Sequence, residues 1–382
     1  MTVPRTGDSP AARVGLQLGA LLGPFGGGIV AAILPEIGAG FDVSAQAAAA
    51  SLTVYLVPFA ALMLVSGTLG QRWGPARTIR LAYVAYAVVT LVAAVAPWFW
   101  LFQVGRGLMG CANAFTTPLL MARLAAMTPP DRLGKALGVF GAMQAVGQTS
   151  APLVGGLAAA ASWRWAFVGI ALVGAVLAAW PLPADDADDR AGTARLRDPW
   201  RASVLLPGLA ALTAWGCLAG LSFLVAFRLQ DAFGFGAGMR GLLLTGFGVA
   251  GFLAARFAGA AADRFGGRLT ALTGLLAGAA LVVVIGATGL APLAVAAWAA
   301  AGVCSQLVLV AVNTTVLSGD GPGRSGAISV VQAMRFLGMA AAPAVFTAPY
   351  HADPLLGFAL PAAVLLATVP LTATLARARA RD

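Results

Sequence analysis

The sequence predicts an all-α integral membrane protein with twelve transmembrane helices in two similar halves. Three observations predict this fold class: a strongly apolar composition, long apolar runs along the whole chain, and landmarks of the first half that return in the second. Hydrophobic residues make up 60% of the 382 residues and charged residues 10%, with a mean hydropathy of +0.87. Soluble domains carry about 25% charged residues. Apolar runs of about 18 residues or more can cross a ~30 Å hydrocarbon core as helices.

The repeat is clearest in two short basic segments, each placed between two long apolar stretches. Three pairs of residues in them share one offset of 192 residues: Gly67 and Gly259, Arg72 and Arg264, and Gly74 and Gly266. The Arg-x-Gly sequences at Arg132 and Arg324 share the same offset. Fixed-period similarity in a membrane chain is typical of two fused copies of one helical unit.

The expected spans follow one another in order along the chain. In the first half they are residues 12–34, 47–70, 78–96, 99–126, 134–160 and 163–182. In the second half they are residues 202–229, 238–262, 268–288, 290–318, 325–349 and 355–376. The charged segment 184–200 reads as a solvated linker rather than a site. The expected units are therefore residues 1–183, the linker 184–200, and residues 201–382.

Basic residues predict how the chain lies in the membrane. Eighteen Lys and Arg residues fall on one side of the spans, and Arg164, Arg228 and Arg240 fall on the other. The positive-inside rule then puts both termini in the cytoplasm of a protein integral to the cell (inner) membrane. The net charge of +10 follows from this topology, so we expect lipid and no nucleic acid as a partner. The polar, proline-containing N-terminus is not expected to be a cleaved signal.

Several chemistries are not expected. Cys111, Cys217 and Cys304 lie far apart inside apolar runs, and His351 is the single histidine. This predicts no metal site, no disulfide framework and no cofactor. The sequence contains no Gly-x-x-x-x-Gly-Lys-Ser/Thr segment for ATP and no cluster of reactive side chains at membrane depth. We therefore expect neither an enzyme nor an ATP-driven pump, and nothing in the sequence calls for an oligomer.

Two features of the spans stand out. Gly23, Pro24 and the run 26–28 predict that the first span bends or unwinds, either as a moving part or as a packing accommodation. Arg106 lies in mid-span, where an arginine costs several kcal/mol unless it is paired or faces water. It must face an aqueous cavity, reach Glu36, or bond to carbonyls and amides. A structural arginine that ties the fourth span to the first is the alternative.

The motifs together resemble the major facilitator superfamily, and within it the twelve-helix drug:proton antiporters. The loop motif Gly-x-x-x-Asp-Arg-x-Gly-x-x-Arg is matched at 67–77, with Gln71 in place of the acid, and again at 259–268, where Asp263 keeps it. The antiporter motif of the fifth helix is similar to 147–156, and the embedded arginine of the fourth helix looks like Arg106. Trp163-Arg-Trp165 and Leu34-Pro-Glu36-Ile resemble further family segments.

The resemblance implies two pseudo-symmetric six-helix bundles around a central cavity, which rock to give alternating access. Polar, aromatic and soft side chains on the expected cavity helices are the candidate substrate-binding residues, each of which can instead serve packing: Gln17, Phe25, Tyr55, Arg106, Asn113, Met143, Gln144, Trp215, Phe223, Gln306, Asn313, Gln332 and Arg335. The proton-coupling candidates are Glu36, Arg106 and Asp263. The gating candidates are Gly67, Gln71, Arg72, Gly74, Arg77, Gly259, Asp263, Arg264, Gly266 and Pro152.

The leading interpretation is a secondary active transporter that exports small lipophilic compounds in exchange for protons. The spans lack the deep acid that such exporters often carry, which keeps a second interpretation open. In that alternative the chain moves a neutral or anionic metabolite, such as a sugar or an organic acid. A non-transporting receptor or scaffold is a third class, which the absence of an extra soluble domain in the sequence disfavours.

Overall fold

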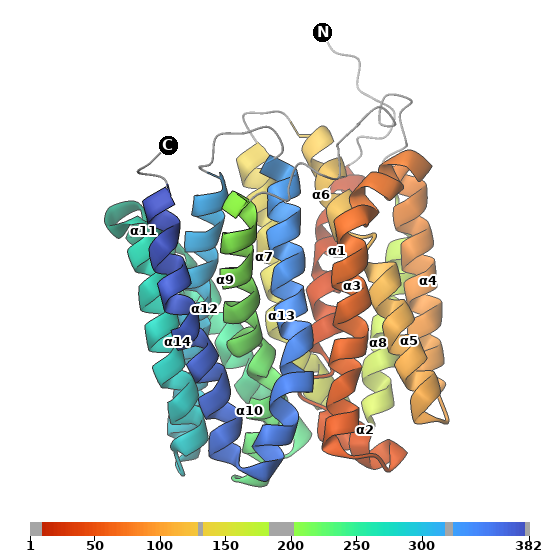
Figure 1. Ribbon diagram of the computed structural model, residues 1–382. Coiled ribbons are helices and arrows are strands. Elements are labelled where there is room, and N and C mark those ends of the chain that lie inside the picture. The colour runs from red at the N-terminus through yellow and green to blue at the C-terminus, as the bar shows by residue number, and fades with distance from the viewer. Residues whose placement is uncertain (1–9, 129–132, 183–201, 318–323, 379–382) are drawn as a thin grey trace.

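The fold follows from the apolar runs, which become long helices that pack side by side in two bundles (Figure 1). The computed structural model describes residues 10–128, 133–182, 202–317 and 324–378. The first bundle holds α1 Pro10–Gly28, α2 Leu34–Phe41, α3 Ala45–Trp73, α4 Pro75–Val95, α5 Phe99–Asn113, α6 Thr117–Ala126, α7 Leu133–Ala159 and α8 Trp163–Ala179. The second holds α9 Ala202–Cys217, the short 3₁₀ helix η2 Ala219–Leu221, α10 Ser222–Asp231, α11 Ala237–Ala287, α12 Ala291–Leu317, α13 Arg324–Ala352 and α14 Pro354–Ala378.

Every expected span coincides with helical structure, and three spans are interrupted inside. The first span divides into α1 and α2, the fourth into α5 and α6, and the seventh into α9, η2 and α10. The predicted break in the first span is therefore present. Among the described residues, seven helices are long and apolar enough to cross a membrane by length and composition. The count of twelve crossings stays a prediction, and the expected linker 184–200 lies outside the described residues.

Two glycines of the repeat make the same turn in both halves. Gly74 joins α3 to α4 with φ 93° and ψ 114°. Gly266 interrupts α11 with φ 82° and ψ 151°, at the place where two separate spans are expected. Positive φ is strained for any residue with a Cβ atom. The repeated glycine in the sequence is therefore explained by a repeated backbone conformation.

The bundle has two distinct ends, which we name by what lies there. α1 begins and α14 ends at the proximal end, whereas α2 and α10 lie at the distal end (Figure 1). The halves meet where α7 packs on α11 and α3 packs on α13. At the first of these contacts, a Cβ atom added to Gly156 or Gly241 would collide with backbone of the other helix. Bare glycine surfaces thus let the two bundles touch backbone to backbone.

Candidate functional site: an interrupted helix between two arginines

The candidate site is organised around the break in the first span. α1 ends at Gly28, and residues 29–33 form turns before α2 begins at Leu34. The last carbonyl groups of a helix have no partner inside the helix. At membrane depth such groups must find donors within the protein, because lipid offers none. The glycine-rich sequence therefore creates a need for hydrogen-bond donors at this place.

Arg106 of α5 supplies one of these donors from within the first bundle. Its Nη1 donates to the carbonyl oxygen of Gly26 (3.2 Å), and its Nε donates to that of Ser51 on α3 (3.4 Å). The guanidinium carbon lies 4.4 Å from the centre of the Tyr55 ring. Arg106 is fully buried, and no carboxylate of the described residues lies within ion-pair distance. A cation at a helix C-terminus is favourable, so carbonyls and an aromatic face stabilise this charge in place of an acid.

Asn113 and Tyr55 extend the same network along α1. The Nδ2 of Asn113 donates to the Tyr55 hydroxyl (2.6 Å) and to the carbonyl of Gly23 (3.2 Å). Its Oδ1 accepts from the hydroxyl of Thr116 (2.8 Å), in the break between α5 and α6. The polar network thus fixes two interrupted spans against each other, because Asn113 bonds both to α1 and to the break between α5 and α6.

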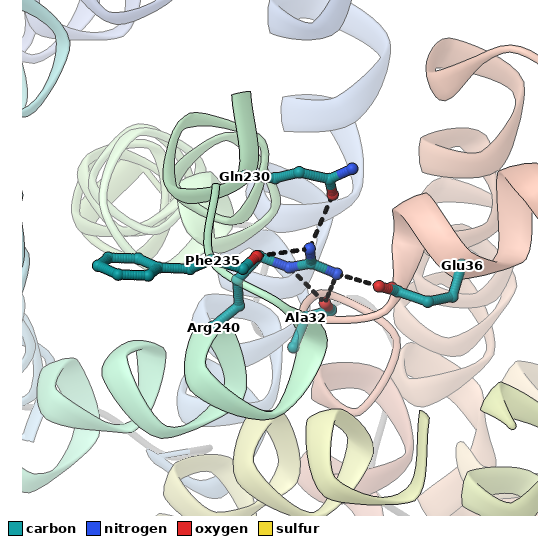
Figure 2. A network of polar contacts seen from close by, with 5 residues as sticks. All are labelled: Ala32, Glu36, Gln230, Phe235 and Arg240. Carbon is teal, nitrogen blue, oxygen red and sulfur yellow. Dashed lines mark hydrogen bonds and ion pairs between the residues drawn. The ribbon is translucent and has the colours of Figure 1, made fainter. Parts of the chain in front are cut away.

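Arg240 of α11 binds the broken segment from the second bundle (Figure 2). Its Nε and Nη2 both donate to the carbonyl of Ala32 (3.3 and 3.2 Å), and Nη2 also forms an ion pair with Glu36 of α2. Nη1 donates to Gln230 Oε1 (2.8 Å) and to the carbonyl of Phe235 (3.1 Å) within its own bundle. Arg240 is 2% exposed and Glu36 27% exposed. One side chain therefore links the two bundles at the distal end.

A small cavity lies between the bundles next to the break. It encloses about 60 Å³. It is lined by Gly23, Pro24, Gly27, Gly28, Tyr55, Leu56, Phe59, Gln148, Thr149, Pro152, Ala219, Ser222, Leu244, Phe247, Gly248, Trp298, Phe336 and Met339. Residues of both bundles meet across it: Phe59 and Phe336 pack edge to face with ring centres 4.9 Å apart. Ligand pockets typically measure 300–1,000 Å³, so the space is closed down in this conformation.

Arg335 of α13 lies beside this cavity. Its guanidinium carbon is 4.6 Å from the ring centre of Trp215 on α9 and 5.1 Å from that of Phe336. Its Nη1 donates to Gln332 Oε1 (2.9 Å), whereas its Nε has no hydrogen-bond partner among the described residues. The predicted residues Trp215, Gln332 and Arg335 thus form one cluster in the second bundle.

Other predicted residues are more scattered. Tyr55 and Pro152 are the two predicted site residues that line the small cavity. Half-buried positions on the surrounding helices are taken by Gln17, Phe25, Met143, Gln144 and Gln306. Phe223 is fully buried against Phe227. The side chain of Asn313 lies outside the described part of the chain.

The remaining gating candidates lie around the two repeated turns. Arg72, Arg77 and Arg264 are exposed there, and Gly67 and Gly259 are half-buried. The side chains of Gln71 and Asp263 lie outside the described part, so the gating and proton-coupling roles of Asp263 stay predictions. Sequence reasoning missed Arg240, Phe59, Gly241 and Trp298. For Arg240 a signal was available, because it is one of three basic residues on the side that the positive-inside rule leaves poor in charge.

Arg106→Lys is expected to destabilise the protein although it keeps the charge. An ammonium group cannot reproduce the planar fork that reaches Gly26 and Ser51 together. Loss of one charge-assisted hydrogen bond costs about 2 kcal/mol, which should lower the midpoint of thermal unfolding in detergent. Arg80→Lys, on an exposed position of α4, is the matched control. Equal midpoints for the two variants would contradict the assigned role of the fork.

Comparison with known proteins agrees with this geometry. A sequence profile of the Major Facilitator Superfamily matches residues 16–343. A multidrug resistance protein B homolog of Mycobacterium tuberculosis is 32% identical over 172 residues, which is 44% of this chain and 31% of that protein. The chain thus matches less than a third of the length of such curated relatives.

Solved structures match nearly the whole chain. A bacterial homolog of the human lysosomal transporter Spinster, inward-facing and unoccupied, has a TM-score of 0.74 at 17% identity, covering 97% of this chain and 96% of that one. The xylose transporter XylE from E. coli, partially occluded and inward-open, has a TM-score of 0.72 at 14% identity, covering 94% and 95%. The match of the profile over most of the chain shows that it belongs to the Major Facilitator Superfamily, and the solved structures show the same fold of two pseudo-symmetric helical bundles.

Proposed function

We propose that the chain is a secondary active transporter that exports small lipophilic compounds in exchange for protons by alternating access. The observation that carries the proposal is a cavity between two bundles that are joined at the distal end by the Arg240–Glu36 pair. A cross-bundle ion pair of this kind can form in one state and break in the other. Breaking it would let the bundles separate at the distal end and open the cavity to that side.

The wall of the cavity supports lipophilic substrates. Leu56, Phe59, Phe247, Trp298 and Met339 offer aromatic and flexible apolar surface. Such walls adapt to the shape of varied apolar compounds. The multidrug name of one relative is consistent with this substrate class.

Glu36 is the carboxylate that we propose to carry the proton. Its Oε1 pairs with Arg240, and its buried Oε2 has no hydrogen-bond partner among the described residues. Protonation would remove the charge with which Arg240 pairs. Proton uptake and closure of the distal end would therefore compete for one carboxylate, which is the coupling that an antiporter requires.

In this proposal the proximal end faces the cytoplasm, in accord with the excess of basic residues there. Both termini would then be cytoplasmic, in a monomer integral to the cell membrane. The exchange needs no covalent chemistry, no metal and no cofactor, and we propose no enzymatic activity.

A second candidate function is transport of a neutral or anionic metabolite. Two arginines, Arg106 and Arg335, lie against the rings of Tyr55 and Phe336, which line the cavity, whereas no described lining residue is acidic. A carboxylate or phosphate of a substrate would be attracted to such a site. The similarity to the fold of a xylose transporter leaves sugars within this alternative.

The decisive experiment is transport by purified protein in proteoliposomes with an imposed pH gradient and a lipophilic dye. The proposal expects dye movement driven by the gradient in the wild type. Glu36→Gln should lose the dependence on the gradient while dye still equilibrates. Dye movement by the wild type that does not depend on the pH gradient would overturn antiport and favour a facilitator for neutral or anionic solutes.

A further inference from the structure

The first bundle carries a second hollow, on the side that lies farthest from the second bundle. It is a groove of about 810 Å³ between α4 and α5, closed at one end by the last turn of α3. α4 and α5 form the outer edge of the molecule in Figure 1. This volume is within the range of ligand pockets, and it is far larger than the cavity between the bundles. In a membrane-spanning protein, the molecules that reach this face are lipids.

The groove has the length of one lipid leaflet. Its lining residues on α4 run from Arg77 to Val89. At 1.5 Å per residue this distance is about 18 Å. Half of the hydrocarbon core of a bilayer is about 15 Å. A lipid whose headgroup lies at Arg77 would therefore place an acyl chain along the whole groove.

The polar groups of the groove gather at its proximal end. Arg72 and Arg77 are exposed there, and Trp73 stacks on Phe115 with ring centres 5.9 Å apart. Thr78 follows directly and is only 6% exposed. Thr78 is one of the residues that line the groove, and its buried hydroxyl has no hydrogen-bond partner among the described residues. A buried hydroxyl of this kind is costly unless a ligand or water satisfies it.

Farther from the proximal end, the residues that line the groove are apolar. Leu81 and Leu108 are 57% and 50% exposed, which is the exposure of side chains that face acyl chains rather than the protein core. Val89 and Cys111 complete this part. Two basic groups and a hydroxyl above an apolar channel match an anionic amphiphile.

We propose that this groove is a binding site for an anionic phospholipid of the leaflet at the proximal end. Arg72 and Arg77 hold the phosphate, the Thr78 hydroxyl donates to a phosphate or ester oxygen, and one acyl chain lies against Leu81 and Leu108. The site is independent of what the cavity between the bundles transports. Each basic residue near a membrane surface favours anionic lipid, by about fivefold in affinity.

Cys111 offers a direct measurement because it lies in the wall of the groove and is half-buried, whereas Cys217 and Cys304 are 3% and 5% exposed. The protein is placed in phosphatidylcholine nanodiscs with and without phosphatidylglycerol, and the rate of Cys111 modification by a lipid-soluble maleimide is measured. Phosphatidylglycerol is expected to slow the reaction. The variant Cys111→Ser lacks this thiol and therefore shows which part of the measured modification belongs to Cys111.

Charge variants test the headgroup site. The double variant Arg72→Gln, Arg77→Gln is expected to lower the affinity for phosphatidylglycerol by about 25-fold, at about fivefold for each arginine. Protection of Cys111 should then require correspondingly more of this lipid. Thr78→Val should weaken it further, whereas Arg72→Lys with Arg77→Lys should largely retain it. Arg80→Gln is the matched control, since Arg80 is exposed on the same helix but does not line the groove.

Native mass spectrometry of the same variants counts retained phosphatidylglycerol without relying on the thiol. The proposal expects the wild type and the lysine variant to retain it, and the double glutamine variant to lose it. Equal protection by phosphatidylcholine, or equal retention by the glutamine variant, would overturn the site.

Discussion

Arg240→Gln is expected to shift the protein strongly toward a conformation that is open at the distal end. Arg240 makes three hydrogen bonds across the bundles, two to Ala32 and one to Glu36. Glutamine can replace only part of these and leaves Glu36 without its counter-charge. Removing one partner of a buried ion pair costs about 3 kcal/mol at the lower end of the usual range, which fits the partial exposure of Glu36. The ratio of closed to open molecules should then fall about 100-fold.

Spin labels at Asp42 and Ala232 would report this opening, in a variant without the native cysteines. Both positions are exposed, and they lie at the distal end of different bundles. Arg164→Gln is the matched control, because Arg164 donates to the carbonyls of Ala94 and Ala96 (2.7 and 3.0 Å) within its own bundle. Distances should lengthen with Arg240→Gln and stay unchanged with Arg164→Gln. The same distance distribution in both variants would refute the cross-bundle role.

A double-mutant cycle separates the ion pair from the bonds to Ala32. If Glu36 acts mainly through Arg240, adding Glu36→Gln to Arg240→Gln should cause little further opening. Additive effects would instead show that Glu36 acts through another group.

Gly241→Ala is expected to disfavour closure of the distal end as well, for a steric reason. A Cβ atom at this position would collide with the carbonyl oxygen of Pro152 and approach the Cα of Gly156 to 3.1 Å. Both neighbours are backbone atoms of α7, so they can give way only if the bundles move apart. Overpacking of this kind costs about 2 kcal/mol. We therefore expect closure of the distal end to be at least tenfold less favourable and transport to slow accordingly.

Gly236→Ala provides the control for this substitution. Gly236 lies just before α11, and a Cβ atom there would have nothing within 4 Å. Transport per molecule in proteoliposomes should be normal for Gly236→Ala and strongly reduced for Gly241→Ala at equal amounts of folded protein. If Gly241→Ala transported at the wild-type rate, the close contact between α7 and α11 would not limit transport, and the prediction would be wrong.

The fold was predictable because its causes are local in the sequence. Apolar runs give the spans, and the repeat gives the two halves, down to Gly74 and Gly266 with their positive φ angles. The break after Gly28 was likewise visible as a glycine cluster behind a proline. Each of these features depends on backbone freedom or hydropathy, which single residues reveal.

The partners of the buried arginines were not predictable. Arg106 was recognisable as an arginine in mid-span, but its partners are carbonyl groups, and every residue has one. Arg240 and Ala32 are 208 residues apart, and alanine in a span has no distinctive chemistry. The sequence does reveal the three basic residues that depart from the positive-inside rule. Arg164, Arg228 and Arg240 each donate to at least one backbone carbonyl.

The aromatic residues that line the cavity were not predicted from the sequence, for a different reason. Phe59, Phe336 and Trp298 are apolar residues in apolar runs, which is the usual composition of a helix core. Trp298 stands in the second half where Arg106 stands in the first, at the same offset of 192 residues. The repeat relates the positions of two helices, and it does not relate the chemistry of the residues that they carry.

The closed cavity has a consequence for measured affinities. Its 60 Å³ is far below the about 300–1,000 Å³ that ligand pockets typically measure. A drug-sized ligand must therefore bind to an expanded conformation. If that conformation is populated in one molecule of about a hundred, the observed dissociation constant is about a hundredfold weaker than the contacts alone would give. Substitutions that loosen the distal end should then tighten apparent binding from that side, although they touch no ligand.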